Sequence, residues 1–300
     1  MKRHASIVVC LLFPLTVTAE HFFEAGLRIG LAGYHAQCTY VATIPNWHAG
    51  VQLTYSYHSP TVFGVRTGLT VDRQQAGLGK TNYTDSYTTM DVENEPMEVN
   101  YSIGRLNEVY KTWSMGLPLQ LALTWKHICL YVGPKIVMPL RISWQETAED
   151  ASLSVFYPLQ NNLVQESYPI AASRSFAETQ SGIKKTEIQW WLSAELCYDI
   201  ALYATKRCKS YLSVGAYIDI SIVPQKDEPS EQISLLTLSD TRDGLPLHRT
   251  MASIITANRQ NKQLVWKYQP FNAGIKIAYR FAPYNPLKQN ADKCNCYSLL

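Results

Sequence analysis

Residues 271–281 carry the pattern that most constrains the fold of this chain. Apolar and polar side chains alternate strictly there, with Phe271, Ala273, Ile275, Ile277, Tyr279 and Phe281 in one phase and Asn272, Gly274, Lys276, Ala278 and Arg280 in the other. A strand points alternate side chains to opposite faces, so one face is apolar and the other polar. The segment has the roughly 9 to 11 residues that a tilted strand needs to cross a bilayer, and it ends on an aromatic residue. The pattern predicts a membrane-spanning strand, apolar outside and polar inside.

The first residues predict export. Lys2 and Arg3 precede an apolar run over residues 7–17, and Val17, Thr18 and Ala19 have the character of a cleavage site. We therefore expect residues 1–19 to be a signal peptide. Beyond them no stretch approaches the roughly 18 consecutive apolar residues of a membrane helix, so we expect insertion into a membrane to use strands.

Composition agrees with a membrane surface and argues against nucleic acid. Charged residues make up 17% of the chain, and there are 19 Tyr and 7 Trp, the aromatic residues that favour bilayer interfaces. The net charge of +3 is too small to indicate a nucleic-acid partner.

Period-two alternation occurs in eight segments. They cover residues 24–33, 48–57, 62–72, 108–123, 128–144, 186–204, 211–223 and 271–281. Longer connections alternate with tight ones, and residues 73–107, 145–185 and 224–263 are the three longest, which we interpret as polar loops.

This order of connections predicts an all-β, up-and-down antiparallel transmembrane β-barrel with both ends in the periplasm. We expect eight strands, or ten if a loop contributes two more, because an even number closes the sheet and leaves no unpaired edge in lipid. The predicted organisation is a signal peptide (1–19), an outer-membrane barrel with long extracellular loops (20–282) and a periplasmic tail (283–300).

The inward phase carries charges of both signs. We predict a polar network in the lumen made by Glu24, Arg28, Arg66, Lys135, Arg141, Glu195, Asp199, Asp219, Lys276 and Arg280. An eight-stranded barrel is just wide enough for its own side chains, so we expect paired charges in place of an ion path.

Aromatic residues in the outward phase predict the two membrane interfaces. We expect Trp113, Trp144, Trp190, Trp266 and Tyr268 near the extracellular one and Trp125, Tyr203 and Phe281 near the periplasmic one. Lys267, the one cation in the outward phase, lies just before Phe271 and should project above the membrane on the extracellular side, because a charge at mid-bilayer costs about 2 to 4 kcal/mol.

Three prolines lie inside predicted strands. Pro118, Pro134 and Pro139 each remove a ladder hydrogen bond, which is unusual away from a sheet edge. The sequence GLPLQL at residues 116–121 and the sequence YVGPK at residues 131–135 resemble the paired "PL" and "GP" strands of PorT-like outer-membrane β-barrel proteins. The resemblance extends to the Gly-rich first strand and to residues 275–281. It implies a barrel fold and admits a role in protein secretion or envelope assembly.

No pattern of catalytic, cofactor-binding or metal-ligating residues stands out, so we expect no enzyme activity, no cofactor and no metal. We expect a structural or ligand-binding protein of the outer membrane that uses its long loops. An accessory role in secretion or assembly is the alternative, and a barrel enzyme that hydrolyses lipid or peptide is a third. The expected partners are outer-membrane lipid, the barrel-assembly machinery and an envelope protein.

Overall fold

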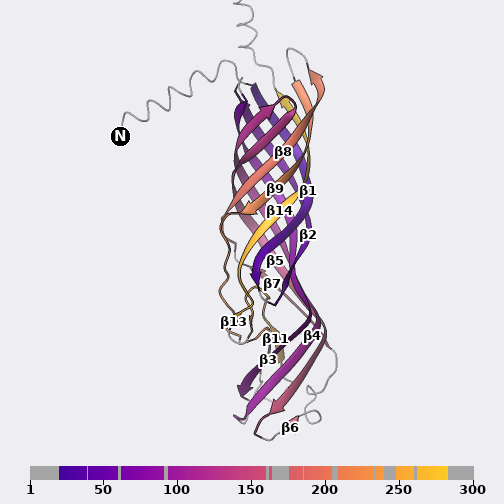
Figure 1. The fold of residues 1–300 in the computed structure, drawn as a ribbon, viewed down its shortest axis with the longest axis vertical. Helices are drawn as coiled ribbons and strands as arrows, with labels where there is room; N and C mark the ends of the chain where they lie inside the picture. The colour runs from indigo at the N-terminus through magenta and orange to yellow at the C-terminus, as the bar shows by residue number, and fades with distance from the viewer. Residues whose placement is uncertain are drawn as a thin grey trace, which may run out of the picture.

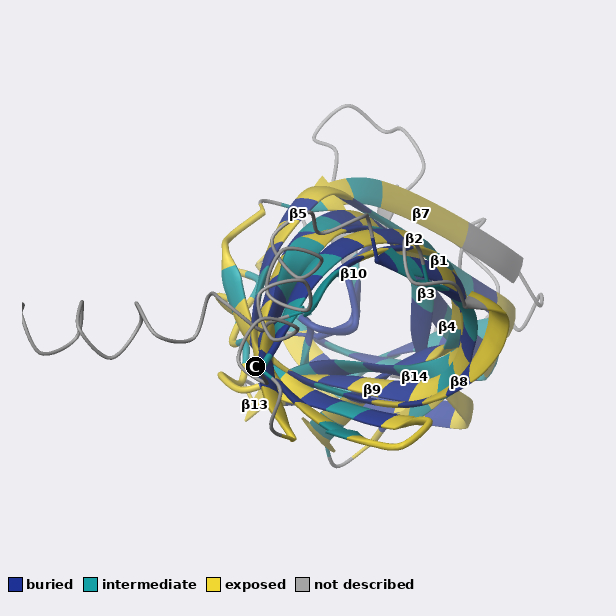
Figure 2. Cartoon of the chain, turned by 90° about the horizontal axis from the view of Figure 1, so that it is seen from above, coloured by how far each residue is buried: buried dark blue, intermediate teal, exposed yellow. Residues whose placement is uncertain are grey.

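Eight antiparallel strands close into a ring in the computed structural model of this chain. The structure describes residues 20–282 apart from 39, 60–61, 91–93, 160–161, 164–175, 185, 205–208, 233, 240–247 and 260–261. The ring consists of β1 (Glu20–Cys38), β2 (Ala42–His58), β3 (Phe63–Met90), β4 (Pro96–Trp125), β5 (Ile128–Tyr157), β8 (Gln189–Ala204), β9 (Lys209–Ser221) and β14 (Val265–Ala282). Sequential neighbours pair, and β1 pairs β14, which closes the barrel seen end-on in Figure 2. The predicted eight-stranded, up-and-down, all-β fold is confirmed.

A belt of exposed apolar side chains surrounds the ring. Leu27, Leu53, Leu121 and Ile275 are 58 to 67% exposed, although each lies in the middle of a paired strand. Exposed apolar surface of this extent is unfavourable in water and is matched by the hydrocarbon core of a bilayer. We take the belt as the membrane-spanning part of the barrel.

Aromatic residues lie at both rims of this belt, with two exceptions to the prediction, Tyr268 and Trp144. Trp113, Trp190 and Trp266 are exposed on the extracellular side, where Lys267 is exposed as well. Tyr268 is only 3% exposed and lies in the interior, so its predicted interfacial position is wrong. The alternation breaks at Trp266 and Lys267, which are both exposed, opposite a register shift between Gln37 and Cys38. Trp144 is partly buried against the apolar core described below and lies opposite the buried Tyr110, so its predicted interfacial position is wrong as well.

Three ring strands continue far beyond the belt, where the sequence predicted loops. β3 and β4 pair from Phe63↔Leu123 out to Met90↔Pro96, and β5 pairs with β4 as far as Phe156. These strands form the long curved extension at the bottom of Figure 1. The interpretation of residues 73–107 as a loop is therefore wrong, and residues 145–185 include the outer half of β5 as well as β7 (Phe176–Lys184), which pairs with β5.

Shorter strands complete the extracellular region. β6 (Asn162–Leu163) pairs with the tip of β5. The connection between β9 and β14 contains two small hairpins, β10 (Leu236–Ser239) with β11 (His248–Met251) and β12 (Asn258–Arg259) with β13 (Lys262–Gln263).

An apolar core holds the extension together. Leu78, Ile103 and Leu106 of the extended strands pack with Leu235, Leu236, Ile254, Ile255 and Leu264 of the connection before β14, and all are at most 1% exposed. Residues 224–263, predicted as a solvated loop, thus supply much of a buried core. Burial of these side chains stabilises the extension by the hydrophobic effect.

The extended strands change phase in one shared row. Asn82, Gly104 and Asp150 lie between the pairs Thr81↔Arg105 and Tyr83↔Ile103 and the pairs Ile103↔Ala151 and Arg105↔Glu149. Asn82 and Asp150 both have a φ of 53°, a left-handed conformation that Asn and Asp tolerate better than most residues. A Cβ on Gly104 would lie 2.9 Å from the Cβ of Asp150, which explains the glycine. The inward positions therefore switch from Leu106 to Ile103 on β4.

Among the described residues, no helix is long and apolar enough to cross a membrane. The predicted signal peptide, residues 1–19, and the predicted tail, residues 283–300, lie outside the described residues and stay predictions.

Candidate functional site

Nine of the ten predicted lumen residues lie buried inside the barrel. Toward the extracellular end, Arg28 is 2.6 Å from Asp219, and Lys135 is 3.0 Å from both Asp72 and Asp219. In the middle, Arg66 and Lys276 each contact both Glu24 and Glu195 at 2.6 to 2.8 Å. Arg280 pairs with Asp199 at the periplasmic end. Together with Asp72, the network sets five cations against five carboxylates.

Neutral side chains complete the network, and none of them is among the ten residues predicted for the lumen. Gln52 donates to Glu24, Ser193 donates to Asp219, and Gln120 donates to Ser193. His48 hydrogen-bonds Tyr217 and Asp72. The guanidiniums of Arg28 and Arg66 lie over the rings of Tyr217 and Tyr131. Inward phase alone would have found these residues, because each lies on the same strand face as the charges.

Arg141 is exposed, so its predicted place in the lumen is wrong. Trp113 pairs with Arg141, but the next residue, Ser114, pairs with Pro139. Leu140 is thus an extra residue on β5, and both Leu140 and Arg141 face outward. The bulge follows Pro139, which has no backbone N–H to donate to the ladder.

A cleft opens on the extracellular side, next to the extracellular rim of the belt. β5 pairs with β8 only as far as Val137↔Gln189, and beyond that point β7 takes over as the neighbour of β5. β9 ends at Ser221, opposite Trp191, while β14 continues outward. The seam between β7 and the segment after β9 is therefore not joined by the main sheet, and a cleft of about 920 Å³ lies there.

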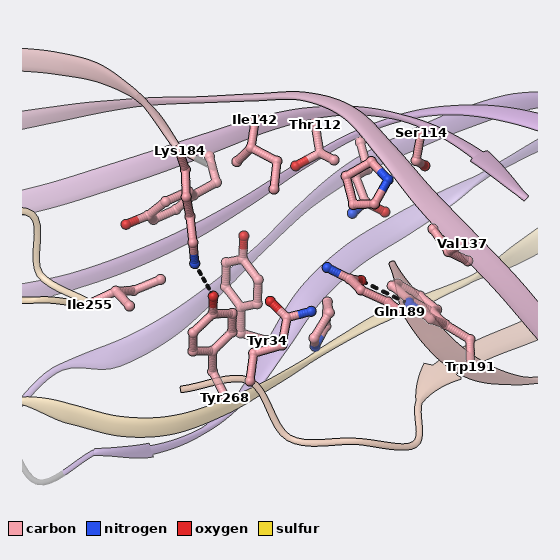
Figure 3. Close-up of a pocket in the computed structure, with 15 residues that line it drawn as sticks. Tyr34, Thr112, Ser114, Val137, Ile142, Lys184, Gln189, Trp191, Ile255 and Tyr268 are labelled. Atoms are coloured by element: carbon pink, nitrogen blue, oxygen red, sulfur yellow. Dashed lines mark hydrogen bonds between the residues drawn. The ribbon is translucent and has the colours of Figure 1, made fainter. Parts of the chain in front are cut away.

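The cleft has apolar and polar walls. Ile183, Ile188, Trp190 and Val223 are 49 to 71% exposed along it. Its polar side includes Gln180, Gln189, Gln225 and the Lys184–Asp227 ion pair. Figure 3, a close-up of the neighbouring interior, shows that Lys184 also contacts the hydroxyl of Tyr268. Burial, reinforced by Asp227, raises the pKa of Tyr268, so this hydroxyl stays protonated.

Gln225 supplies an unused donor at the inner end of the cleft. Its backbone N–H and C=O bond those of Tyr268, which fixes the segment after β9 against β14. Its side-chain Nε2 is buried and has no hydrogen-bond partner in the protein. A buried donor without a partner costs about 1 to 3 kcal/mol, a cost that a bound acceptor would remove.

Two buried carboxyl groups face each other in the extension. Glu108 and Glu146 are directly opposite in the β4–β5 register and are both fully buried. Glu108 accepts hydrogen bonds from the hydroxyls of Tyr110 and Ser253 and from the N–H of Ile254, at 2.5 to 2.6 Å. It therefore anchors the connection before β14 to the extended sheet.

The environment of this pair favours the protonated forms. Burial raises the pKa of Glu108 to about 7, although its hydrogen bonds oppose the rise. Burial and the facing Glu108 raise the pKa of Glu146 well above its usual value, and neither oxygen of Glu146 has a partner. Among the described residues, no three His, Cys, Asp or Glu side chains gather into a metal site.

The closed ring, the apolar belt and the paired charges inside it define an outer-membrane β-barrel. No protein-family model and no curated protein sequence matches the chain, so the PorT-like resemblance stays a prediction. Among solved structures, the chain is similar to Ail, the attachment invasion locus protein of Yersinia pestis, determined with the heparin analogue sucrose octasulfate. The two are 8% identical over 86% of this chain and 99% of that chain, with a TM-score of 0.23. We base the class on the ring and the belt.

Proposed function

We propose that this chain is a non-enzymatic outer-membrane protein that binds a surface ligand in the cleft beside β7. The observation that carries the proposal is the combination of a 920 Å³ cleft with the unpartnered, buried Nε2 of Gln225 inside it. Ligand sites are commonly concave and mostly apolar, with a few fixed polar groups that orient the ligand.

The cleft walls indicate the chemistry of the ligand. Trp144, Trp190 and Ile183 offer apolar contact, and the amides of Gln180, Gln189 and Gln225 offer hydrogen bonds. An oligosaccharide or a short peptide has such a mixture of apolar and hydrogen-bonding faces. The paired charges in the lumen support a binding role over a pore.

The extension supports the same role by holding the cleft in shape. β7 is paired with β5, and the segment after β9 is paired with β14 through Gln225 and Tyr268. Because both walls are attached to the sheet, little conformational entropy is lost when a ligand binds.

The test uses the purified full chain in mild detergent and a panel of oligosaccharides and short peptides. We expect at least one compound to bind, and to bind about tenfold more weakly, or about 1.4 kcal/mol, to Gln225→Ala. Gln145→Ala is the matched control, because Gln145 is an exposed glutamine that does not line the cleft. A panel without any binder, or equal binding by all three proteins, would contradict the proposal.

The accessory role in secretion or envelope assembly remains the alternative that the PorT-like resemblance implies. That role would use the periplasmic turns and residues 283–300. Removal of residues 283–300 would then abolish capture of an envelope partner and leave the cleft ligand bound. Recognition of the chain by the barrel-assembly machinery is part of the same prediction.

A further inference from the structure

Three cations on β3, β4 and β5 and two tryptophans, Trp47 on β2 and Trp113 on β4, gather on the outer surface of the barrel. Arg73 pairs with Trp113, and Trp113 pairs with Arg141, so these three side chains form one row across the strands. Lys111 lies two residues further out on β4, on the same face. The Arg73 guanidinium carbon is 5.2 Å from the ring centroid of Trp113 and 5.3 Å from that of Trp47. We call Arg73, Lys111 and Arg141 the rim cations.

The rim cations lie where the apolar belt ends. Toward the middle of the belt, the same outward face carries Val71 on β3, Leu117 on β4 and Met138 on β5, all at least partly exposed. Further from the membrane, the outward positions of β3 and β5 include Gln75 and Gln145. Tryptophan and arginine at such a boundary occupy the headgroup layer of a bilayer. The rim cations are therefore at the height of lipid phosphates in the outer leaflet.

The charge of this patch is not neutralised by the protein. Within the described part of the chain, no rim cation forms an ion pair. Arg105, further out on β4, is different because it pairs with Glu149 at 3.4 Å. Arginine also occurs in the lumen, where every guanidinium contacts a carboxylate. The positive charge of the rim cations is therefore available to an anion from outside the protein.

We infer that the rim cations bind the phosphate groups of an outer-leaflet lipid whose acyl chains lie along the belt. Neighbouring strands are about 4.8 Å apart, so Arg73 and Arg141 are separated by about 10 Å at the backbone, with Trp113 between them. Two arginine side chains span that distance around one phosphate, and Lys111 approaches from above. Arginine suits this task because its planar group donates two parallel hydrogen bonds to phosphate.

The position of Trp113 and Trp47 fits the same occupant. Both rings hold the Arg73 guanidinium against the barrel wall, and their apolar edges are next to the belt. A lipid with phosphate at the rim and acyl chains below would contact both kinds of surface at once. The inference is independent of the cleft, which lies beside β7 and contains none of these residues.

The test measures lipid binding to the full chain in mild detergent by native mass spectrometry, with bisphosphorylated lipid A as the probe. We expect Arg73→Gln/Arg141→Gln to weaken binding about tenfold or more. Arg105→Gln is the control, since it removes an exposed arginine of β4 that lies outside the patch and should leave binding unchanged. Slower gel migration after boiling shows that each variant is folded.

Further arms distinguish the source of the phosphate. Phosphatidylcholine, whose phosphate is balanced by a cation, should bind much more weakly than lipid A, and inorganic phosphate should displace little of the bound lipid. Unchanged binding by the double variant, equal binding of phosphatidylcholine, or full displacement by inorganic phosphate would overturn the inference.

A second measurement serves if the double variant does not fold. Arg73→Lys/Arg141→Lys keeps the charge and should retain most of the binding. In the unmodified chain, raising the salt concentration from about 0.05 to about 0.5 M should weaken lipid A binding, because salt screens the charges. Salt-independent binding would overturn the inference.

Discussion

Strands β3, β4 and β5 pass through two regions in which opposite faces are apolar. Within the belt, β4 turns Leu117, Leu119 and Leu121 outward and Gln120 inward. In the extension, the same strand turns Val99 and Ile103 inward and Glu98 and Asn100 outward. The surroundings decide which face is apolar, because lipid covers the outer face in the belt and water covers it in the extension. The same three strands therefore carry their apolar side chains on the outer face in the belt and on the inner face in the extension.

The two cores should therefore fail in different ways, and the largest effect is expected in the barrel. Asp219 contacts Arg28 at 2.6 Å and Lys135 at 3.0 Å and accepts a hydrogen bond from Ser193. Asp219→Asn leaves two buried cations short of a counter-charge, which costs about 3 to 5 kcal/mol in the free energy of unfolding. Urea unfolding of the barrel in lipid vesicles measures this loss.

The control for Asp219 is an exposed carboxylate of the extension. Glu149→Gln removes a solvent-exposed ion pair with Arg105 and should change the same free energy by less than about 1 kcal/mol. Equal losses in the two variants would show that the lumen network does not stabilise the barrel.

Removing a side chain from the apolar core of the extension should destabilise the extension and leave the barrel intact. Ile103 is fully buried among apolar side chains, and Ile103→Ala should cost about 2 to 4 kcal/mol through lost contacts and a cavity. Limited proteolysis of the extension should become faster, while the gel shift on boiling, which reports the closed barrel, stays the same. Ile275→Ala is the matched control, since Ile275 is 60% exposed in the belt. A joint loss of barrel and extension would mean that the two regions unfold as one unit.

The belt could be predicted from the sequence because its chemistry is local. Each strand in the belt carries its own alternation, as in residues 271–281, and the number and order of such segments implied the closed ring. Nine of the ten charged residues predicted from the inward phase also lie in the lumen network. Arg141 failed because a bulge at Leu140 shifts the phase by one residue, and nothing in the sequence except Pro139 marks that position.

The extension could not be predicted in the same way. Its strands alternate too, with Tyr83, Asp85 and Tyr87 inward and Thr84 and Thr88 outward, but tyrosine and threonine give a weak contrast in polarity. The shared phase change at Asn82, Gly104 and Asp150 interrupts each pattern in the middle. The inner partners, such as Ile254 and Leu264, come from the distant connection before β14. The cleft depends on where β8 begins and β9 ends, which is a tertiary feature.

The smallest effect is expected from pH, and it should act on the extension alone. Both Glu108 and Glu146 have a pKa raised by burial, to about 7 for Glu108. A carboxyl group with a raised pKa in the folded state contributes stability that is complete below the unfolded pKa of about 4.3 and is lost as pH rises through the folded pKa. The extension should therefore be more stable at pH 4.5 than at pH 8.

Glu146→Gln isolates this contribution, because glutamine has the same shape and no charge to bury. The variant should stabilise the extension at pH 8 by about 1 kcal/mol or more, since one pKa unit corresponds to about 1.4 kcal/mol. The difference from the unmodified chain should vanish near pH 4, where Glu146 is protonated in both states. Methyl NMR signals of Ile254 and Ile255, followed during urea titration at each pH, report the extension directly, because the N–H of Ile254 donates to Glu108. If Glu146→Gln destabilised the extension at pH 8, Glu146 would have to be ionised and held by a cation, and the two regions would then share the same use of buried charge.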